Sequence, residues 1–108
     1  MISGIYKDMK ICIHTNDFEL DESNHQLILR KFKLALTRIE PFIKTITMHL
    51  STASDVNPCN DIHCKLNVCL CDKPSFIVED IQKDLDFVVD RVIQKASRSI
   101  NRKLVGDM

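Results

Sequence analysis

The chain has 108 residues, which is enough for one domain with a hydrophobic core and too few for two. Its 15 Lys and Arg balance its 15 Asp and Glu, so the composition excludes the strong global field of a histone-like polyanion binder. Any binding to nucleic acid must therefore come from a local separation of charge.

The first residues, MISGIYKDMKICIH, lack the basic start and long apolar run of a secretory signal. No apolar stretch approaches the roughly 18 residues of a membrane span. These features predict a soluble, cytoplasmic protein that does not bind a membrane. The 5 cysteines are an odd number, which favours reduced thiols over a disulfide framework.

The first half of the chain shows a strand pattern followed by a helix pattern. Residues 9–14 alternate between apolar and polar side chains, as in a half-buried strand. Asp21 and the short polar residues after it suit a helix N-terminus, and apolar residues then recur three or four apart until Pro41. The first helix is therefore predicted over residues 22–39.

The second half of the chain shows three strand patterns and a second helix pattern. Residues 44–51 and 62–71 again alternate with period two. The polar segment between them is longer than a tight hairpin needs, and we expect a mobile loop there. The run FIVE at residues 76–79 predicts a short fourth strand, and the apolar stripe after it predicts a helix over Gln82–Lys103.

This order of strand, helix, three strands and helix predicts an α+β fold. The middle strands can pair as antiparallel hairpins, and two apolar helix stripes need a common sheet face to cover. We therefore expect a four-stranded sheet with both helices packed on one face.

The second predicted helix carries a row of regularly spaced basic residues. They step by four, three and four residues, so on a helix they project from one side, away from the apolar stripe. This side is about 16 Å long at 1.5 Å per residue, enough to touch about two or three nucleic-acid phosphates. We expect solvent or a binding partner to be its only shared neighbour. The members of this cationic flank are Arg91, Lys95, Arg98 and Arg102.

An ordinary solvated helix face explains the same row and stays open as an alternative. Cations are favoured near a helix C-terminus, and the acids Asp84, Asp86 and Asp90 come earlier in the helix, where the dipole favours them.

The first predicted helix offers a second basic group. Lys31 and Arg38 share one side of that helix, whereas Arg30 and Lys33 lie elsewhere on its exposed surface. If the two helices pack side by side, this group and the cationic flank would join into one basic surface.

Three stretches, in this order and spacing, resemble a known family. They are MKICIHTNDFELDES with the following LILRKF, then CKLNVCL, and then KDLDFVVDRVIQKASRSINRKL. They resemble the short ribosome hibernation-promoting factors and ribosome-associated inhibitors, also called sigma-factor modulation proteins. The resemblance covers residues 9–104 and predicts one ribosome-binding domain there, with residues 1–8 as an N-terminal extension.

The resemblance implies a βαβββα fold, similar to a double-stranded-RNA-binding domain. It implies binding to the 30S ribosomal subunit and its 16S rRNA, near the channel for mRNA and tRNA. Translation would be blocked by occupancy, which preserves idle ribosomes under stress or in stationary phase. It implies no cofactor and no small-molecule substrate, and it leaves open whether two copies pair as a homodimer.

By position, Lys31, Lys95 and Arg98 match basic residues of the family's two helices, and Arg102 continues the same face. The other basic residues of the two helices are candidates by location only. The complete set of RNA-binding candidates is Arg30, Lys31, Lys33, Arg38, Arg91, Lys95, Arg98, Arg102 and Lys103.

The chain also departs from the family. The loop between the second and third strands is often basic in the family, whereas here it contains Asp55 and Asp61 and no Lys or Arg. The turn before the last strand, often glycine-rich in the family, is CDKPS. We therefore expect weaker affinity for ribosomal RNA or a changed partner.

Cysteine and histidine residues near the third strand raise the alternative of a metal-responsive or protein-interaction module on the same scaffold. Regular alternation would turn Cys64 into the core and the other strand members to the opposite face, and no Cys-x-x-Cys pair is present. These features argue against a metal site. The outer face could also collect Cys12, His14 and His49. The residues near the third strand are Cys59, His63, Cys64, Cys69 and Cys71.

The sequence offers no sign of enzymatic chemistry. It has no nucleophile elbow, oxyanion turn or phosphate loop, and it has only 2 glycines. One tyrosine and no tryptophan leave little for base stacking. We therefore expect a protein that is not an enzyme and that recognises RNA by phosphate position and shape.

Overall fold

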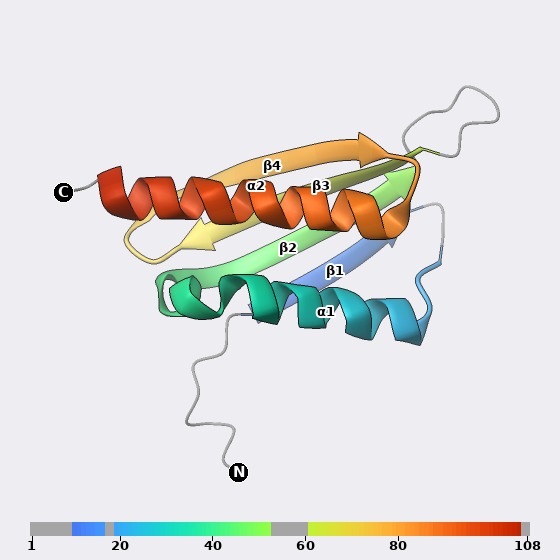
Figure 1. The fold of residues 1–108 in the computed structure, drawn as a ribbon, viewed down its shortest axis with the longest axis horizontal. Coiled ribbons are helices and arrows are strands. Elements are labelled where there is room, and N and C mark those ends of the chain that lie inside the picture. The colour runs from blue at the N-terminus through green and yellow to red at the C-terminus, as the bar shows by residue number, and fades with distance from the viewer. Residues whose placement is uncertain (1–9, 17–18, 53–60, 107–108) are drawn as a thin grey trace, which may run out of the picture.

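A computed structural model of the chain describes residues 10–16, 19–52 and 61–106. Its element order confirms the predicted α+β class (Figure 1). The predicted mobile loop falls largely on residues 53–60, and that prediction, like Cys59, lies outside the described residues. The elements are β1 (Lys10–Asn16), α1 (Glu22–Leu36), a short 3₁₀ helix η2 (Thr37–Phe42), β2 (Ile43–Thr52), β3 (Ile62–Leu70), β4 (Lys73–Gln82) and α2 (Leu85–Gly106).

The four strands form one mixed sheet in the order β1-β2-β3-β4. β1 runs parallel to β2, which requires a crossover connection, and α1 provides it. The pairs β2–β3 and β3–β4 are antiparallel. Both helices cover the same face of this sheet, side by side, and α2 packs against β3 and β4 (Figure 1).

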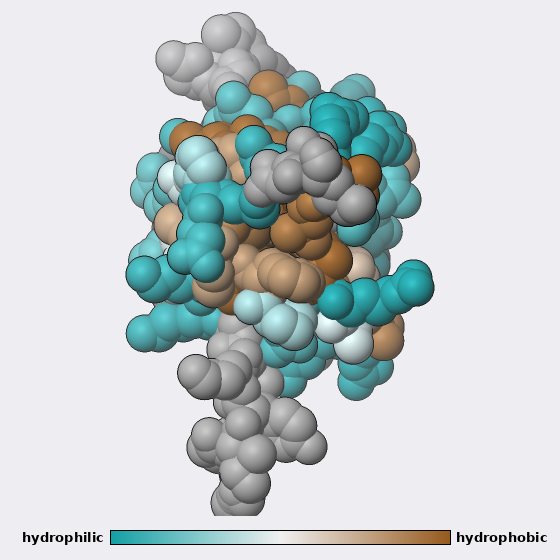
Figure 2. All heavy atoms as spheres, turned by 90° about the vertical axis from the view of Figure 1, so that its left-hand side faces the viewer, coloured by the Kyte–Doolittle hydropathy of each residue, from teal (hydrophilic) through white to brown (hydrophobic). Residues whose placement is uncertain are grey.

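The core lies between the helices and the sheet. Alternate residues of the central strands, such as Met48 and Leu66, have no solvent exposure, which confirms the predicted alternation. Phe32 of α1 and Ile100 of α2 close the core from the helix side. At the end of the molecule that holds the C-terminus of α2, hydrophobic residues gather in the centre and hydrophilic residues surround them (Figure 2).

No helix of the described residues covers the opposite side of the sheet, and we call this side the open sheet face. Its side chains come from the strand positions that alternate with the core positions. It includes Lys10, Cys12 and His14 of β1, Thr47 and His49 of β2, His63, Lys65 and Cys69 of β3, and Ile77, Glu79 and Ile81 of β4.

Helix boundaries differ from the predicted ones for identifiable reasons. α1 ends at Leu36 and the chain continues as η2, which contains Pro41. Proline disfavours α-helical backbone at the residue before it and lacks an N–H donor. α2 begins at Leu85, because the Asp84 carboxylate accepts a hydrogen bond of 2.9 Å from the Phe87 N–H.

β4 is longer than the predicted segment 76–79. Pro74 is tolerated near its start because β4 is an edge strand. The two-residue connection from β3 places Asp72 at φ 64°, a left-handed conformation that Asp adopts more readily than most residues. No helix in the described ranges is long and apolar enough to cross a membrane.

Candidate nucleic-acid interface

The packing of α2 fixes the direction of the cationic flank. Val92 and Ala96 are fully buried against the sheet, so the flank lies on the side and outer surface of the helix. Arg98 and Arg102 are exposed, and neither makes an ion pair with any residue that the structure describes. These two arginines are therefore available to an external anion.

Arg91 and Lys95 meet a carboxylate of β4 instead. The Arg91 Nε atom donates to Asp80 Oδ2 at 3.1 Å, and Lys95 Nζ lies 3.8 Å from Asp80 Oδ1. Lys95 Nζ also donates to the Glu79 backbone carbonyl at 2.9 Å. The expectation that solvent or a partner is the flank's only shared neighbour is wrong for these two residues. Asp80 lies opposite buried Cys64, so it faces the helix layer.

Asp80 stays ionised in this position. Its side chain is only 16% exposed, and burial by itself would raise the pKa. Hydrogen bonds from Arg91, from Gln82 and from the Ile81 N–H, together with the charge of Lys95, outweigh burial and lower the pKa of Asp80. Asp80 is therefore a fixed negative charge beneath the flank.

Cys64 lies opposite Asp80 in the core, and its thiol is protonated at neutral pH. Burial, and secondarily the charge of Asp80, raise the pKa of Cys64 to about 12. The thiol of Cys64 is therefore protonated at neutral pH and serves as a small core residue.

Lys103, the last candidate on α2, is partly buried. Its Nζ lies 5.3 Å from the centroid of the Phe76 ring, a cation–π contact between α2 and β4. This contact holds Lys103 against β4, so the charge of Lys103 lies at the edge of the sheet.

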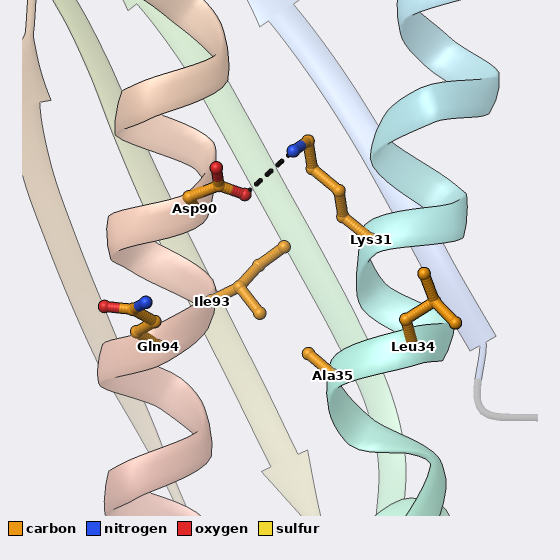
Figure 3. Close-up of a pocket in the computed structure, with 6 residues that line it drawn as sticks. All are labelled: Lys31, Leu34, Ala35, Asp90, Ile93 and Gln94. Carbon is orange, nitrogen blue, oxygen red and sulfur yellow. Dashed lines mark hydrogen bonds and ion pairs between the residues drawn. The ribbon is translucent and has the colours of Figure 1, made fainter.

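On α1, Lys31 points toward α2. Its Nζ donates to Asp90 Oδ1 at 2.9 Å, and Figure 3 shows this ion pair bridging the two helices. Arg30, Lys33 and Arg38 are exposed, and no ion pair involves them among the residues the structure describes. Arg30 and Lys33 flank Lys31 in sequence and therefore project from other sides of the helix.

A shallow depression lies between the two helices at the level of Lys31 and Asp90. The helices lie side by side, and this depression of about 340 Å³ is lined by apolar side chains and one ion pair, not by a row of cations (Figure 3). Its lining residues are Lys31, Leu34, Ala35, Asp90, Ile93 and Gln94.

The histidines and cysteines of the four strands are spread over the open sheet face and the core. The rings of His14 and His49 stack with centroids 5.1 Å apart, and His63 Nε2 lies 2.7 Å from Glu79 Oε1. In the part of the chain that the structure describes, no three His, Cys, Asp or Glu residues are arranged to hold a metal ion. Cys71 lies in the turn after β3, not on the strand as predicted.

Sequence reasoning missed Asp80, although a signal was present. Phe76 and Val78 alternate onto the helix-facing side of β4, and period two then places Asp80 on that side as well. An acid at an inward position of an edge strand predicts a cationic partner on the covering helix.

Comparisons of the sequence and of the fold with known proteins give different results. No protein-family profile matches the chain, and no curated protein matches it. The architecture is an α+β domain in which a four-stranded mixed sheet carries two helices on one face.

Solved structures share this architecture. A ribosomal subunit interface protein from Coxiella burnetii superimposes with a TM-score of 0.75 at 14% identity, over 90% of this chain and 99% of that one. The N-terminal domain of Protein Y from Thermus thermophilus gives 0.68 at 14% identity, over 88% and 97%. The resemblance found in the sequence is therefore confirmed at the level of the fold.

Proposed function

We propose that this protein is a cytoplasmic, ribosome-associated hibernation factor. It binds the small subunit through 16S rRNA near the mRNA and tRNA channel and blocks translation by occupying that space. The fold is shared with a protein named for the ribosomal subunit interface. The observation that supports the proposal most is the pair Arg98 and Arg102, exposed on one helix side with no ion pair in the described residues.

Arginine suits this role because its planar fork donates two parallel hydrogen bonds to phosphate oxygens. Arg98 and Arg102 are about one helical turn apart, so they lie about 6 Å from each other along α2 and can contact phosphates of the same RNA strand. Such contacts fix position on an RNA backbone without reading its sequence. Inhibition then needs steric exclusion only, and no bond is made or broken.

The nine candidates divide by their present partners. Five of them are exposed, make no ion pair with a described residue and form the direct contacts in this proposal. Lys31, Arg91 and Lys95 are held by carboxylates, and Lys103 rests on Phe76. The five exposed candidates without an ion pair in the described ranges are Arg30, Lys33, Arg38, Arg98 and Arg102.

Co-sedimentation with purified 30S and 50S subunits tests the proposal. We expect the protein to pellet with 30S subunits at low salt, to be released as salt rises, and to inhibit translation in a cell-free system. The charge reversal Arg98→Glu with Arg102→Glu should weaken pelleting and leave thermal unfolding unchanged. A protein that stays in the supernatant with 30S subunits at low salt would contradict the proposal.

A second candidate is a protein-interaction module on the same scaffold. It is favoured by Ile77 and Ile81 of β4, which are 52% and 49% exposed and lie on the open sheet face on either side of Glu79. In this case the protein would not bind ribosomes and would co-purify with a protein partner. A stoichiometric zinc content in the purified protein would instead support the metal-responsive form of this alternative.

A further inference from the structure

Two carboxylates of the chain hold three of its candidate RNA contacts. Asp80 binds Arg91 and Lys95 at 3.1 and 3.8 Å, and Asp90 binds Lys31 at 2.9 Å. The acids come from different elements, β4 and α2, and the two clusters share no residue. The arrangement therefore occurs twice, once on each side of α2.

A carboxylate and an RNA phosphate use the same donors. A carboxylate is planar and a phosphate is tetrahedral, but the anionic oxygens of both accept charge-assisted hydrogen bonds from guanidinium and ammonium groups. Arg91 already gives its Nε–H to Asp80, and Lys31 gives a hydrogen bond to Asp90. A phosphate that approaches these side chains must therefore compete with an acid that is already in place.

The geometry decides which partner moves when that competition occurs. Asp80 is fixed, because it also accepts hydrogen bonds from the Ile81 N–H at 2.9 Å and from Gln82 Nε2 at 3.3 Å. Arg91 and Lys95 are 46% and 39% exposed, so their long side chains can swing outward from the same backbone positions. Asp90 is 50% exposed and Lys31 is 23% exposed, so that pair can open from the acid side.

We propose that Asp80 and Asp90 are built-in competitors of RNA phosphate that hold Lys31, Arg91 and Lys95 in the free protein and release them when RNA binds. This inference rests on the proposed function, since it concerns the same surface. The competitors lower affinity for any single phosphate. An RNA surface that offers several phosphates at once engages the free arginines first and then draws the held cations away from the two acids. The two acids thereby lower the protein's nonspecific affinity for polyanions.

The test compares Asp80→Asn, Asp90→Asn and their double variant with wild type. At position 80, asparagine keeps one oxygen that can accept from the Ile81 N–H. It removes the charge and replaces the oxygen that accepts from Arg91 and Gln82 by an NH2 group, which cannot accept a hydrogen bond. Asp86→Asn is the matched control, because it makes the same change in net charge on α2 at an exposed acid with no ion pair among the described residues. Binding is measured to 30S subunits and to an unrelated RNA duplex of about 16 base pairs, at several salt concentrations.

Partly exposed ion pairs are weak, so each substitution should tighten binding by about 2- to 5-fold at low salt. The double variant should gain about the product of the two factors, because the clusters are separate. The gain should shrink as salt screens the competing carboxylates. The control should stay within about 2-fold of wild type, which measures the effect of net charge alone.

The outcomes separate this inference from the proposed function. If wild type binds 30S subunits but the Asp80 and Asp90 variants bind no better than the Asp86 control, the competitor role is wrong and the function stands. Weaker binding of the Asp80 variant would show that Asp80 positions its cations for RNA, which also overturns the inference. If the variants gain affinity for the duplex while no form binds 30S subunits, the competitor role stands and the ribosomal function fails. Binding to neither RNA by any form overturns both.

Discussion

Removal of Arg98 and Arg102 should lower the salt dependence of ribosome binding and leave the free energy of unfolding almost unchanged. The variant Arg98→Ala with Arg102→Ala deletes the two exposed guanidinium groups of the cationic flank. Since both side chains lie on the solvent side of α2 and make no ion pair within the described ranges, the core is untouched. Surface substitutions of this kind change the unfolding free energy by about 0.5 kcal/mol or less.

The magnitude follows from counterion release. Each neutralised phosphate contributes about 0.7 to 0.9 to the slope of log affinity against log salt. The loss of two contacts should therefore reduce the slope by about 1.4 to 1.8. Each lost contact should also cost about 3-fold more affinity at 50 mM salt than at 200 mM, because the wild type loses its advantage as salt rises.

Fluorescence anisotropy of labelled protein with 30S subunits over a salt series measures both quantities. The matched control is Lys10→Ala with Lys65→Ala, which removes the same charge from the open sheet face, away from α2. We expect the control to keep the slope of the wild type. If the control lowers the slope as much as the flank variant does, binding depends on net charge and the reasoning from the flank is refuted.

Three further predictions concern the residues around the interface and the core. Asp80→Asn should lower the free energy of unfolding by about 1 kcal/mol at neutral pH. Because the pKa of Asp80 in the folded protein lies below its ordinary value of 3.8, the difference between wild type and variant should persist above pH 3.8 and vanish as the pH falls through the lower folded pKa. Urea unfolding at a series of pH values measures this difference. Ile100→Ala should lower the unfolding free energy by about 2 to 5 kcal/mol, because the side chain has no solvent exposure, and a loss below 1 kcal/mol would mean that the site collapses around the cavity. In native protein, iodoacetamide should modify the exposed Cys12 and Cys71 and leave Cys64 intact, as peptide mass spectrometry would report, since the Cys64 thiol is buried with a pKa of about 12.

Periodicity in the sequence predicts most of the fold. The apolar alternation of β2 and β3 and the stripes of the two helices predict which faces are buried, and the structure confirms the strands and the second helix. On the first helix Ile28 and Phe32 are buried as the stripe predicts, whereas Ala35 is exposed. Boundaries depend on local chemistry that periodicity does not record. Pro41 converts the end of the first helix into η2, and the Asp84 cap delays the start of α2.

The candidate interface is less predictable, because it depends on contacts between elements distant in sequence. Helical spacing places Arg98 and Arg102 together on one side of α2, and the structure agrees. The pairing of Lys31 with Asp90 joins residues 59 positions apart and follows only from the packing of α1 beside α2. A count of charges along one helix therefore overestimates how many cations are free.

The resemblance in the sequence and the likeness of the fold support each other, but they concern different properties. At 14% identity, the structural neighbours establish the arrangement of strands and helices. The proposed ribosomal role depends instead on this chain's own exposed cations and on their access to RNA.

Site-specific photocrosslinking to 30S subunits identifies which face of the protein contacts RNA. A photoreactive residue at Asn101, an exposed position beside Arg98 and Arg102, leaves the cationic flank intact, and one at Ile77 samples the open sheet face. We expect crosslinks to 16S rRNA from position 101 and few or none from position 77. Crosslinks from position 77 with none from position 101 would contradict this expectation, since RNA would then contact the face of the sheet that bears no helix.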